Sequence, residues 1–395
     1  MDFGFTPEQE ALRAEVRAFL DAEVPPDHPE PHIVPEEGTD EEWEFGLEIS
    51  RRLRRRGWYT AHWPVAWGGS NLGRVELGLL WEEVAYRGVY PVNTIGMLVA
   101  QLLLQFGTEA QQREHLPPIA HVENIWAEGY SEPDAGSDLA GLGTAAIRTG
   151  DVYVLNGTKI WTGQAHRANW MFVFARTDPL APKHRGISYL ITPIDAPGIR
   201  VVPIQTMAGT VCINQEFFEN VRIPVTNCIG EENHGWQIRR EIGGRGPSGV
   251  GPNDPAVARR HLHQLINYCK ESQPHVGRLY ADPSVRYQLA DLAIENDVLR
   301  WLWYRTLAGG VEDGRRAVAG EIVGIMRREH MQRTARAGVA ILGLRGGLLP
   351  ESGPWAAMQA WFARQYLYSV PATIYGGTVE IHRGLVARAL GLPRA

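Results

Sequence analysis

The sequence predicts an α+β protein, mainly helical, whose strands are confined to the middle of the chain. Apolar residues recur mostly at helical spacing over 1–123, alternate with a period near two over 124–233, and return to helical spacing over 234–395. Blocks of helices, strands and helices in this order indicate segregated layers rather than alternating βαβ units. A chain of 395 residues can bury more than one core, so we expect three domains with these bounds.

The first domain should open with a helix at Pro7. Thr6 supplies a capping hydroxyl, Pro7 suits the first helical position, and Gln9 completes a capping box. Residues 21–40 are rich in proline and acidic side chains and indicate a surface connection. Further helical patterns lie on either side of a turn region, at 41–56 and 74–106.

The middle domain should contain short strands separated by Gly, Pro and Asn turns. The strand candidates are 151–155, 169–177, 186–192, 198–204 and 212–219. Asn156-Gly157 is typical of a type I′ turn, so we expect a hairpin to reverse at that point.

The last domain should be helical. Asp282 can cap a helix that has Pro283 at its first position. Apolar side chains share one face of this helix: Val285, Leu289, Leu292, Leu299 and Leu302. Two further helical stretches cover roughly 312–342 and 354–370.

Composition restricts the class of function. The formal net charge is −6 and the isoelectric point is near 6.1, which does not favour nucleic acid as a partner. The arginines of 51–56 stand among acidic neighbours and indicate a solvated helix face. Three scattered cysteines fit a reducing compartment, and neither a secretory signal nor an apolar run of membrane-spanning length is visible. We expect a cytoplasmic protein that does not span a membrane.

Two sequence blocks indicate a ligand site. Residues 129–138 read Gly-Tyr-Ser-Glu-Pro-Asp-Ala-Gly-Ser-Asp, a loop that can aim backbone N–H groups at a ligand. Residues 156–163 read Asn-Gly-Thr-Lys-Ile-Trp-Thr-Gly and present the aromatic Trp161. Turn donors together with an aromatic plate suit a planar heterocycle with polar edges. An ordinary core position is the other interpretation of Trp161.

These blocks resemble the flavin-binding signatures of the acyl-CoA dehydrogenase family. Three further blocks add to the resemblance: Gly-Thr-Glu at 107–109, Gly-Glu-Glu-Asn-His-Gly-Trp at 230–236, and Gly-Gly-Thr-Val-Glu-Ile-His-Arg at 376–383. The resemblance implies an N-terminal helical domain, a middle β-domain and a C-terminal four-helix bundle. It also implies FAD as cofactor, an acyl-CoA substrate and an acceptor of the electron-transfer flavoprotein type.

The same resemblance assigns roles by position. Tyr130 and Ser131 correspond to residues at the pyrimidine edge of the flavin, and Trp161 to the residue that flanks the isoalloxazine. Ser137 corresponds to the substrate-binding residue near the CoA phosphates. The family's hydroxyl residue near flavin N5 falls on Gly163, and neighbouring Thr162 is the alternative. Three residues of the tail block correspond to a segment along the cofactor: Gly377, Thr378 and Glu380.

The catalytic base of the family is missing from both of its usual places. Gly376 stands where most members carry the glutamate of a Tyr-Glu-Gly-Thr block, and Gly244 stands at the alternative place. Glu241 is the nearest remaining carboxylate, about one helical turn before Gly244, so it could face the same site. Three glycines and a proline follow, so the helix is expected to end or distort there. A solvated helix-end carboxylate is the other interpretation of Glu241.

The motifs that family members lend to a neighbouring subunit's FAD are also missing. The Gln-x-x-Gly-Gly motif aligns with 340–344, where Ala340 replaces the glutamine. The chain therefore resembles subunits of the heteromeric actinobacterial dehydrogenases of steroid side chains and related pimeloyl-CoA-type enzymes. A second dehydrogenase-like subunit is the implied partner. Two alternatives stay open: a non-catalytic partner subunit, and a flavoprotein of altered chemistry.

Two other patterns have plainer interpretations. Residues 244–249 match the glycine spacing of a dinucleotide fingerprint, but no strand precedes them and one is proline, so a loop is expected. His261 and His263 have no supporting ligand at metal-site spacing and are interpreted as a helix-surface pair. No metal site is expected.

Overall fold

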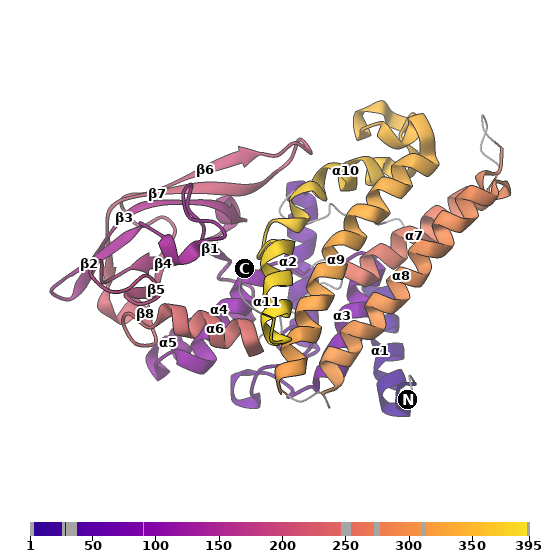
Figure 1. The fold of residues 1–395 in the computed structure, drawn as a ribbon. Coiled ribbons are helices and arrows are strands. Elements are labelled where there is room, and N and C mark those ends of the chain that lie inside the picture. The colour runs from indigo at the N-terminus through magenta and orange to yellow at the C-terminus, as the bar shows by residue number, and fades with distance from the viewer. Residues whose placement is uncertain are drawn as a thin grey trace. The chain divides into compact units, whose positions relative to one another are not determined.

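The computed structural model describes residues 4–25, 28, 38–89, 91–245, 254–271, 277–309 and 313–392. The chain forms two compact units, each assembled from segments far apart in sequence (Figure 1). A helical unit takes in Met1–Ile33, Leu72–Tyr90 and Gly249–Ala395, and a β unit takes in Val34–Asn71 and Pro91–Ser248. The α+β class is confirmed, while the three expected domain bounds remain a proposal.

The β unit is built on one eight-stranded sheet with the order β6-β7-β3-β2-β4-β5-β8, and β1 pairs with β4. The strands are β1 Trp126–Gly129, β2 Ala145–Thr149, β3 Val152–Gly163, β4 Trp170–Arg176, β5 Ile187–Pro193, β6 Ile199–Gln205, β7 Val211–Pro224 and β8 Cys228–Ile229. Strands β1 and β2 run parallel to β4, and the other pairs are antiparallel.

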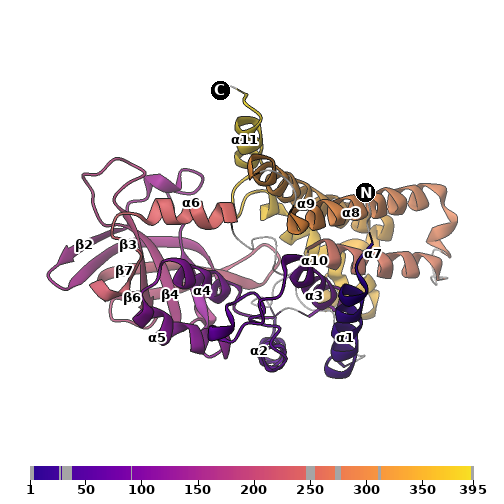
Figure 2. The same ribbon diagram turned by 90° about the horizontal axis from the view of Figure 1, so that it is seen from below.

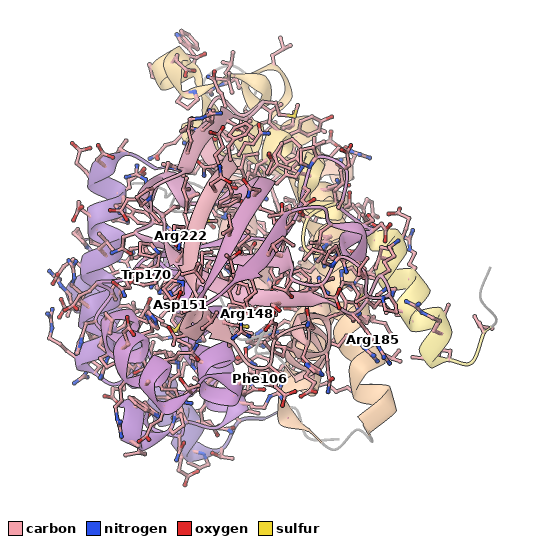
Figure 3. The ribbon with its side chains drawn as sticks, turned by 90° about the vertical axis from the view of Figure 1, so that its left-hand side faces the viewer. Phe106, Arg148, Asp151, Trp170, Arg185 and Arg222 are labelled. Carbon is pink, nitrogen blue, oxygen red and sulfur yellow. The ribbon has the colours of Figure 1, made fainter. Side chains whose placement is uncertain are left out.

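Helices cover one face of this sheet. Along β4, Phe172 and Phe174 alternate with Met171 and Val173, so the two pairs enter different cores. The phenylalanines pack with residues of α4 Thr94–Phe106, α5 Glu109–Ala120 and α6 Gly235–Arg245. Figure 2 shows α4, α5 and α6 lying against the strands, and Figure 3 labels Phe106 and Trp170 on this face. Helix α2 Asp40–Arg55 belongs to the same unit.

A buried polar pair joins β3 to β7. The Thr162 hydroxyl donates to Glu216 Oε2 at 2.6 Å, and both side chains are buried. Glu216 Oε1 accepts no hydrogen bond from the described residues. Burial raises the pKa of Glu216 to about 7, although Thr162 and nearby Lys159 oppose this shift. The carboxyl is therefore protonated more easily here than in the unfolded chain.

The helical unit contains helices from both end regions of the chain. Its helices are α1 Pro7–Glu23, α3 Arg74–Arg87, α7 Asp254–Lys270, α8 Pro283–Ala308, α9 Asp313–Leu342, α10 Trp361–Tyr368 and α11 Val379–Ala389. The long helices α8 and α9 run side by side (Figure 1). The predicted caps are confirmed, because Thr6 and Gln9 form a capping box and Asp282 caps α8.

Glu82 on α3 links four helices of this unit. Its carboxylate, 1% exposed, lies 3.0 Å from Arg259 of α7 and pairs with Arg300 of α8. It also accepts from the Tyr304 hydroxyl at 2.5 Å and lies 3.7 Å from Arg13 of α1. Burial would raise the pKa of Glu82, but these partners outweigh it and hold the pKa below its ordinary value.

The predicted hairpin at Asn156-Gly157 is wrong. Both residues lie inside the continuous strand β3, at a bulge opposite β7, and the Asn156 side chain accepts from the Asn220 N–H. The chain reverses instead at Gly150-Asp151, between Thr149 and Val152, where Gly150 has φ +65°. A glycine with positive φ serves a bulge as well as a turn, so the dipeptide alone does not distinguish them.

Other expectations need smaller corrections. The helical pattern over 74–106 forms two helices, because the chain leaves helical geometry at Gly88 and re-enters after Asn93, both with positive φ. In the stretch 354–370 only α10 is α-helical. Strands β1, β2 and β8 and helices α5, α7 and α11 were not predicted individually.

His261 is not at the surface. It is buried, its ring stacks on Trp361 with centroids 3.5 Å apart, and Nδ1 hydrogen-bonds the Val257 carbonyl. His263 is exposed and lies 2.9 Å from the Tyr86 hydroxyl. No group of metal-ligating side chains, and no helix long and apolar enough to cross a membrane, occurs in the described part of the chain. Most of the glycine-rich loop candidate at 244–249 lies outside the described residues.

Replacing Glu82 by Gln should strongly destabilise the helical unit. The substitution leaves Arg259 and Arg300 largely buried without a counter-charge, which costs about 3–5 kcal/mol. Chemical denaturation monitored by circular dichroism measures the change. Glu10→Gln is the control, since this exposed partner of Arg13 should contribute at most about 1 kcal/mol. Equal effects of the two variants would contradict the role given to Glu82.

Glu216 should make the β unit less stable as pH rises. Because its folded pKa is raised to about 7, its contribution is present below the ordinary carboxyl pKa and is lost as pH rises through about 7. Between about pH 5 and about pH 8, the wild type should lose up to about 3 kcal/mol relative to Glu216→Gln. Urea unfolding at both pH values measures this. The exposed Glu219→Gln on the same strand should follow the wild type.

Candidate cofactor site

A buried lysine joins the two signature blocks. Lys159 on β3 is 0% exposed, and its Nζ donates to the Tyr130 carbonyl at 2.9 Å and to Glu132 Oε1 at 2.8 Å. The Glu132 carboxylate also accepts from the N–H groups of Gly143 and Thr144, at 2.7 and 2.9 Å. Burial lowers the pKa of Lys159 to about 8, against the opposing charge of Glu132. The loop after β1 is thereby fixed to β3.

The loop that Lys159 fixes leaves several polar groups available. Glu132 and Ala135 exchange two backbone hydrogen bonds of 3.1 Å, which close the turn. The Ser131 carbonyl accepts from the Ile160 N–H at 2.9 Å. Within the described residues, no hydrogen bond uses the N–H or hydroxyl groups of Ser131 and Ser137. Ser137 is exposed. These groups can therefore serve a ligand.

Trp161 stands out from β3 at a bulge. The register between β3 and β7 shifts between Ile160 and Thr162, and Trp161 has φ +67°. Such a backbone is unfavourable for a bulky side chain and persists only when its surroundings impose it. The indole is 58% exposed, so the core-aromatic interpretation is wrong. A large aromatic held out of the sheet suits one face of a planar ligand.

The two residues after Trp161 differ: the side chain of Thr162 is already hydrogen-bonded, whereas Gly163 borders open space. The Thr162 hydroxyl is committed to buried Glu216, so Thr162 can offer a ligand only its backbone. A Cβ at Gly163 would meet no atom within 4 Å. The space next to Gly163 is open, the Trp161 indole beside it is exposed, and the Ser131 donors are unused. This arrangement fits a flavin whose polar edge lies on the loop.

The tail block lies in the helical unit. Gly376 and Gly377 have φ +65° and +94°, and Arg328 donates to the Gly376 carbonyl at 3.2 Å. The Thr378 hydroxyl caps α11 by accepting from the Ile381 N–H at 3.2 Å. Glu380 is exposed in the first turn of that helix. The block therefore forms a glycine turn that opens a helix.

The two positions at which the family carries its base, 376 and 244, differ in backbone conformation. Gly376 has left-handed geometry, which disfavours any residue with a Cβ. Gly244 lies within α6, which runs on to Arg245, so the helix does not end at the first glycines. Glu241, on the same helix, is partly exposed and accepts from Gln237 Nε2 at 3.2 Å.

A carboxyl directly before the 129–138 loop, that of Glu128, was not predicted from the sequence. Glu128 on β1 is half-buried, and burial raises its pKa to about 7 although the charge of Arg239 opposes this. The period of two in a strand places Glu128 on the same face as Tyr130, and this signal could have revealed it.

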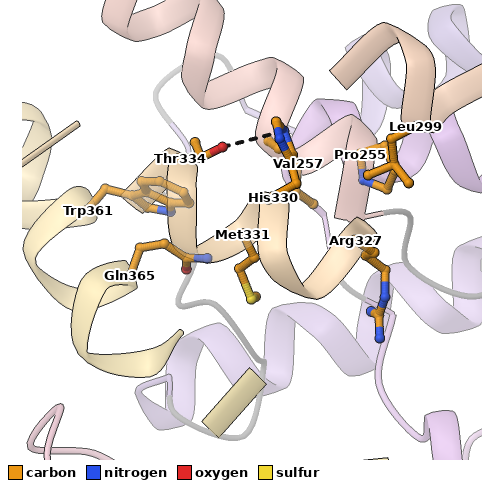
Figure 4. A pocket seen from close by; sticks show the side chains of 10 residues that line it. Pro255, Val257, Leu299, Arg327, His330, Met331, Thr334, Trp361 and Gln365 are labelled. Carbon is orange, nitrogen blue, oxygen red and sulfur yellow. Dashed lines mark hydrogen bonds between the residues drawn. The ribbon is translucent and has the colours of Figure 1, made fainter. Parts of the chain in front are cut away.

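A separate hollow lies in the helical unit (Figure 4). Its volume is about 50 Å³, and Thr334 lies 3.4 Å from His330 on its wall. Gln365 Oε1, also on the wall, accepts no hydrogen bond from the described residues. The space suits one or two structural water molecules rather than a cofactor.

Comparison with known proteins identifies the family. The chain matches the acyl-CoA dehydrogenase N-terminal domain over residues 6–123, the middle domain over 127–221 and the C-terminal domain over 233–391. Acyl-CoA dehydrogenase IpdE1 of Mycobacterium tuberculosis is 34% identical over 352 residues, 87% of each chain. Acyl-CoA dehydrogenase FadE26 of the same organism is 31% identical over 409 residues, 100% of each chain.

Solved structures give the same result. The Tcur3481-Tcur3483 steroid acyl-CoA dehydrogenase has a TM-score of 0.87 and 30% identity, and the ChsE4-ChsE5 complex from Mycobacterium tuberculosis has 0.85 and 30%. Each match covers 100% of both chains. The chain belongs to the acyl-CoA dehydrogenase family of FAD-dependent oxidoreductases and resembles its actinobacterial steroid-type members.

Proposed function

We propose that this chain is a FAD-binding subunit of a heteromeric dehydrogenase that introduces an α,β double bond into a bulky or branched acyl-CoA. The CoA thioester of a steroid side chain is the proposed substrate class, by analogy with the similar Tcur3481-Tcur3483 steroid acyl-CoA dehydrogenase. The observation that carries the proposal is the exposed Trp161 on a strained bulge beside a loop fixed by Lys159. An electron-transfer flavoprotein is the proposed acceptor, and three free cysteines suit the cytoplasm.

The chain's own residues would hold the cofactor from several directions. Bound FAD supplies the acceptor for the hydride that leaves the substrate β-carbon. In this proposal Tyr130 and Ser131 serve the pyrimidine edge, and Trp161 covers one face of the ring. The backbones of Thr162 and Gly163 address the region near N5, and Ser137 serves the CoA phosphates. Three residues of the tail block lie along the cofactor: Gly377, Thr378 and Glu380.

Glycine occupies both usual positions of the base that removes the α-proton, Gly376 and Gly244. A glutamate at position 376 would need the left-handed backbone that Gly376 adopts, so the chain is adapted to glycine there. Glu241 or a carboxylate of the partner subunit is left to accept the proton. If neither does so, the chain acts as a non-catalytic subunit or a flavoprotein of altered chemistry, an alternative that the two glycines favour.

The partner would complete the cofactor site. Ala340 occupies the place of a family glutamine, and its side chain offers no donor to the adenosine half of FAD. A partner that carries the missing glutamine would supply such a donor. The resemblance to the ChsE4-ChsE5 complex supports this assembly.

Trp161→Ala should release the flavin. An indole face buries much of its area against the ring, so its loss should weaken FAD binding at least tenfold. Flavin absorbance per protein after gel filtration, with the partner present, measures this. Leu180→Ala is the control, because this side chain of the same unit is 95% exposed. A Trp161 variant that keeps full flavin content would overturn the placement of the ring.

Glu241→Gln should lower the rate of dehydrogenation about 10²- to 10⁴-fold if this chain uses its own base. Flavin content should stay unchanged, so the loss falls on turnover alone. Stopped-flow reduction of the flavin by acyl-CoA measures the step. Glu231→Gln, an exposed carboxylate before the same helix, should have no effect. Full turnover in the Glu241 variant would assign the proton to another residue or to the partner.

The chain should load fully with FAD only in a hetero-oligomer. Alone, it lacks donors for the adenosine half, so the flavin should be substoichiometric. Co-expression with candidate dehydrogenase-like partners, followed by mass measurement and flavin quantification, tests this. A stable homotetramer with one tightly bound FAD per chain would exclude the partner.

A further inference from the structure

Two buried side chains of β7 hold the residue that follows Trp161. Asn214 Nδ2 donates to the Thr162 carbonyl at 3.0 Å, and Glu216 Oε2 accepts from the Thr162 hydroxyl at 2.6 Å. Both Asn214 and Glu216 are 0% exposed. They alternate along the strand with half-buried Gln215, so they point to the same face of the sheet. Thr162 is therefore attached to β7 through its backbone and its side chain at once.

A further contact fixes the orientation of the Asn214 amide. His166 Nδ1 lies 3.2 Å from Asn214 Oδ1. A carbonyl can only accept, so the NH2 group of Asn214 must face the Thr162 carbonyl, and the Asn214 oxygen must face the imidazole. In this arrangement His166 Nδ1 donates. No second orientation of the amide satisfies both neighbours, so the bond to Thr162 is held in place.

These contacts also hold the strained backbone of Trp161. Ile160 pairs with Gln215 and Thr162 pairs with Asn214, so Trp161 is the extra residue of the bulge between them. Its φ of +67° is unfavourable for a bulky residue and persists only where its surroundings impose it. Without its two attachments to β7, Thr162 would be free to shift along that strand, and Trp161 would be free to relax into regular strand geometry.

The residue before the bulge is fixed as well. The Ile160 N–H donates to the Ser131 carbonyl at 2.9 Å, which joins this side of the bulge to the cofactor loop. The Trp161 indole, 58% exposed, thus stands between one attachment to the loop and two attachments to β7. Its orientation depends on all three.

We propose that Asn214 and Glu216 are positioning residues for the flavin: they hold the Trp161 indole in the orientation that covers the isoalloxazine ring. This inference rests on the proposed FAD site and adds two residues of β7 to it. Neither side chain is exposed, so both act through Thr162 rather than by touching the cofactor. An aromatic face contributes most to binding when it is aligned with the ring that it covers. Loss of either attachment should therefore weaken FAD binding by freeing the indole.

The test is a double-mutant cycle on the dissociation constant of FAD, measured by titrating the flavin-free full chain with its partner. Asn214→Leu and Glu216→Met remove the two attachments at similar side-chain volume. In the chain that carries Trp161, each should raise the Kd about three- to tenfold. In the Trp161→Ala background each should change the Kd less than about twofold, because the group that they position is gone. A merely structural role would change the Kd equally in both backgrounds.

Two further variants serve as controls. Glu216→Gln should restore the wild-type Kd, since its amide oxygen still accepts from the Thr162 hydroxyl. At pH 6, below the pKa of about 7 to which burial raises Glu216, the two side chains differ little in charge. Gln215→Ala, between the two positions and on the other face of β7, should leave the Kd within about twofold. Circular dichroism checks that each variant is folded, and either β7 position decides if the variant at the other does not fold.

An unchanged Kd in the single variants, or an equal change with and without the indole, would overturn the inference. So would a Glu216→Gln variant that binds FAD as weakly as Glu216→Met. If Trp161→Ala alone weakens FAD binding while the β7 variants do not, only this inference fails. If Trp161→Ala leaves the Kd unchanged, or the wild-type complex binds no FAD, the proposed cofactor site fails and this inference with it.

Discussion

The ion pair between Lys159 and Glu132 is the constraint on which the candidate cofactor site depends. A fully buried lysine is unfavourable by itself, and here it is tolerated because a carboxylate and a backbone carbonyl both accept from it. The same carboxylate accepts from two N–H groups further along the loop. This ion pair thus fixes the start and end of the loop to the strand that carries Trp161. The Ser131 donors and the Trp161 indole therefore keep a fixed position relative to each other.

The fold class and the family could be predicted from the sequence because both depend on local signals. Capping residues, the change of period near residue 124 and the two signature blocks are each readable without tertiary information. Asn156-Gly157 was misjudged because the same dipeptide suits a hairpin turn and a bulge, and pairing with β7 decided between them. Glu128 was missed because the burial that raises its pKa depends on tertiary packing, which local signals do not report.

Two functionally important positions of this chain, Trp161 and Gly376, have left-handed backbone geometry. Trp161 has a left-handed backbone, which is strained for a bulky residue and holds its ring exposed. Gly376 adopts a similar backbone without strain because it has no Cβ. Restoring a glutamate at 376 would therefore place the carboxylate on an unfavourable backbone as well as in the helical unit's tail turn. Gain of activity by that single exchange is not expected, since the turn geometry would have to change with it.

Glu82 also has a consequence for how the molecule acquires its structure. Its partners lie on α1, α7 and α8, so the helical unit combines two early segments, Met1–Ile33 and Leu72–Tyr90, with the late segment Gly249–Ala395. During synthesis α3 emerges long before Arg259 and Arg300, so Glu82 lacks these two partners until α7 and α8 have been made. The β unit, whose main segment runs without interruption from Pro91 to Ser248, can fold in that interval. Assembly of the helical unit should therefore be the late and slow event, because it must close the longest loop in the chain.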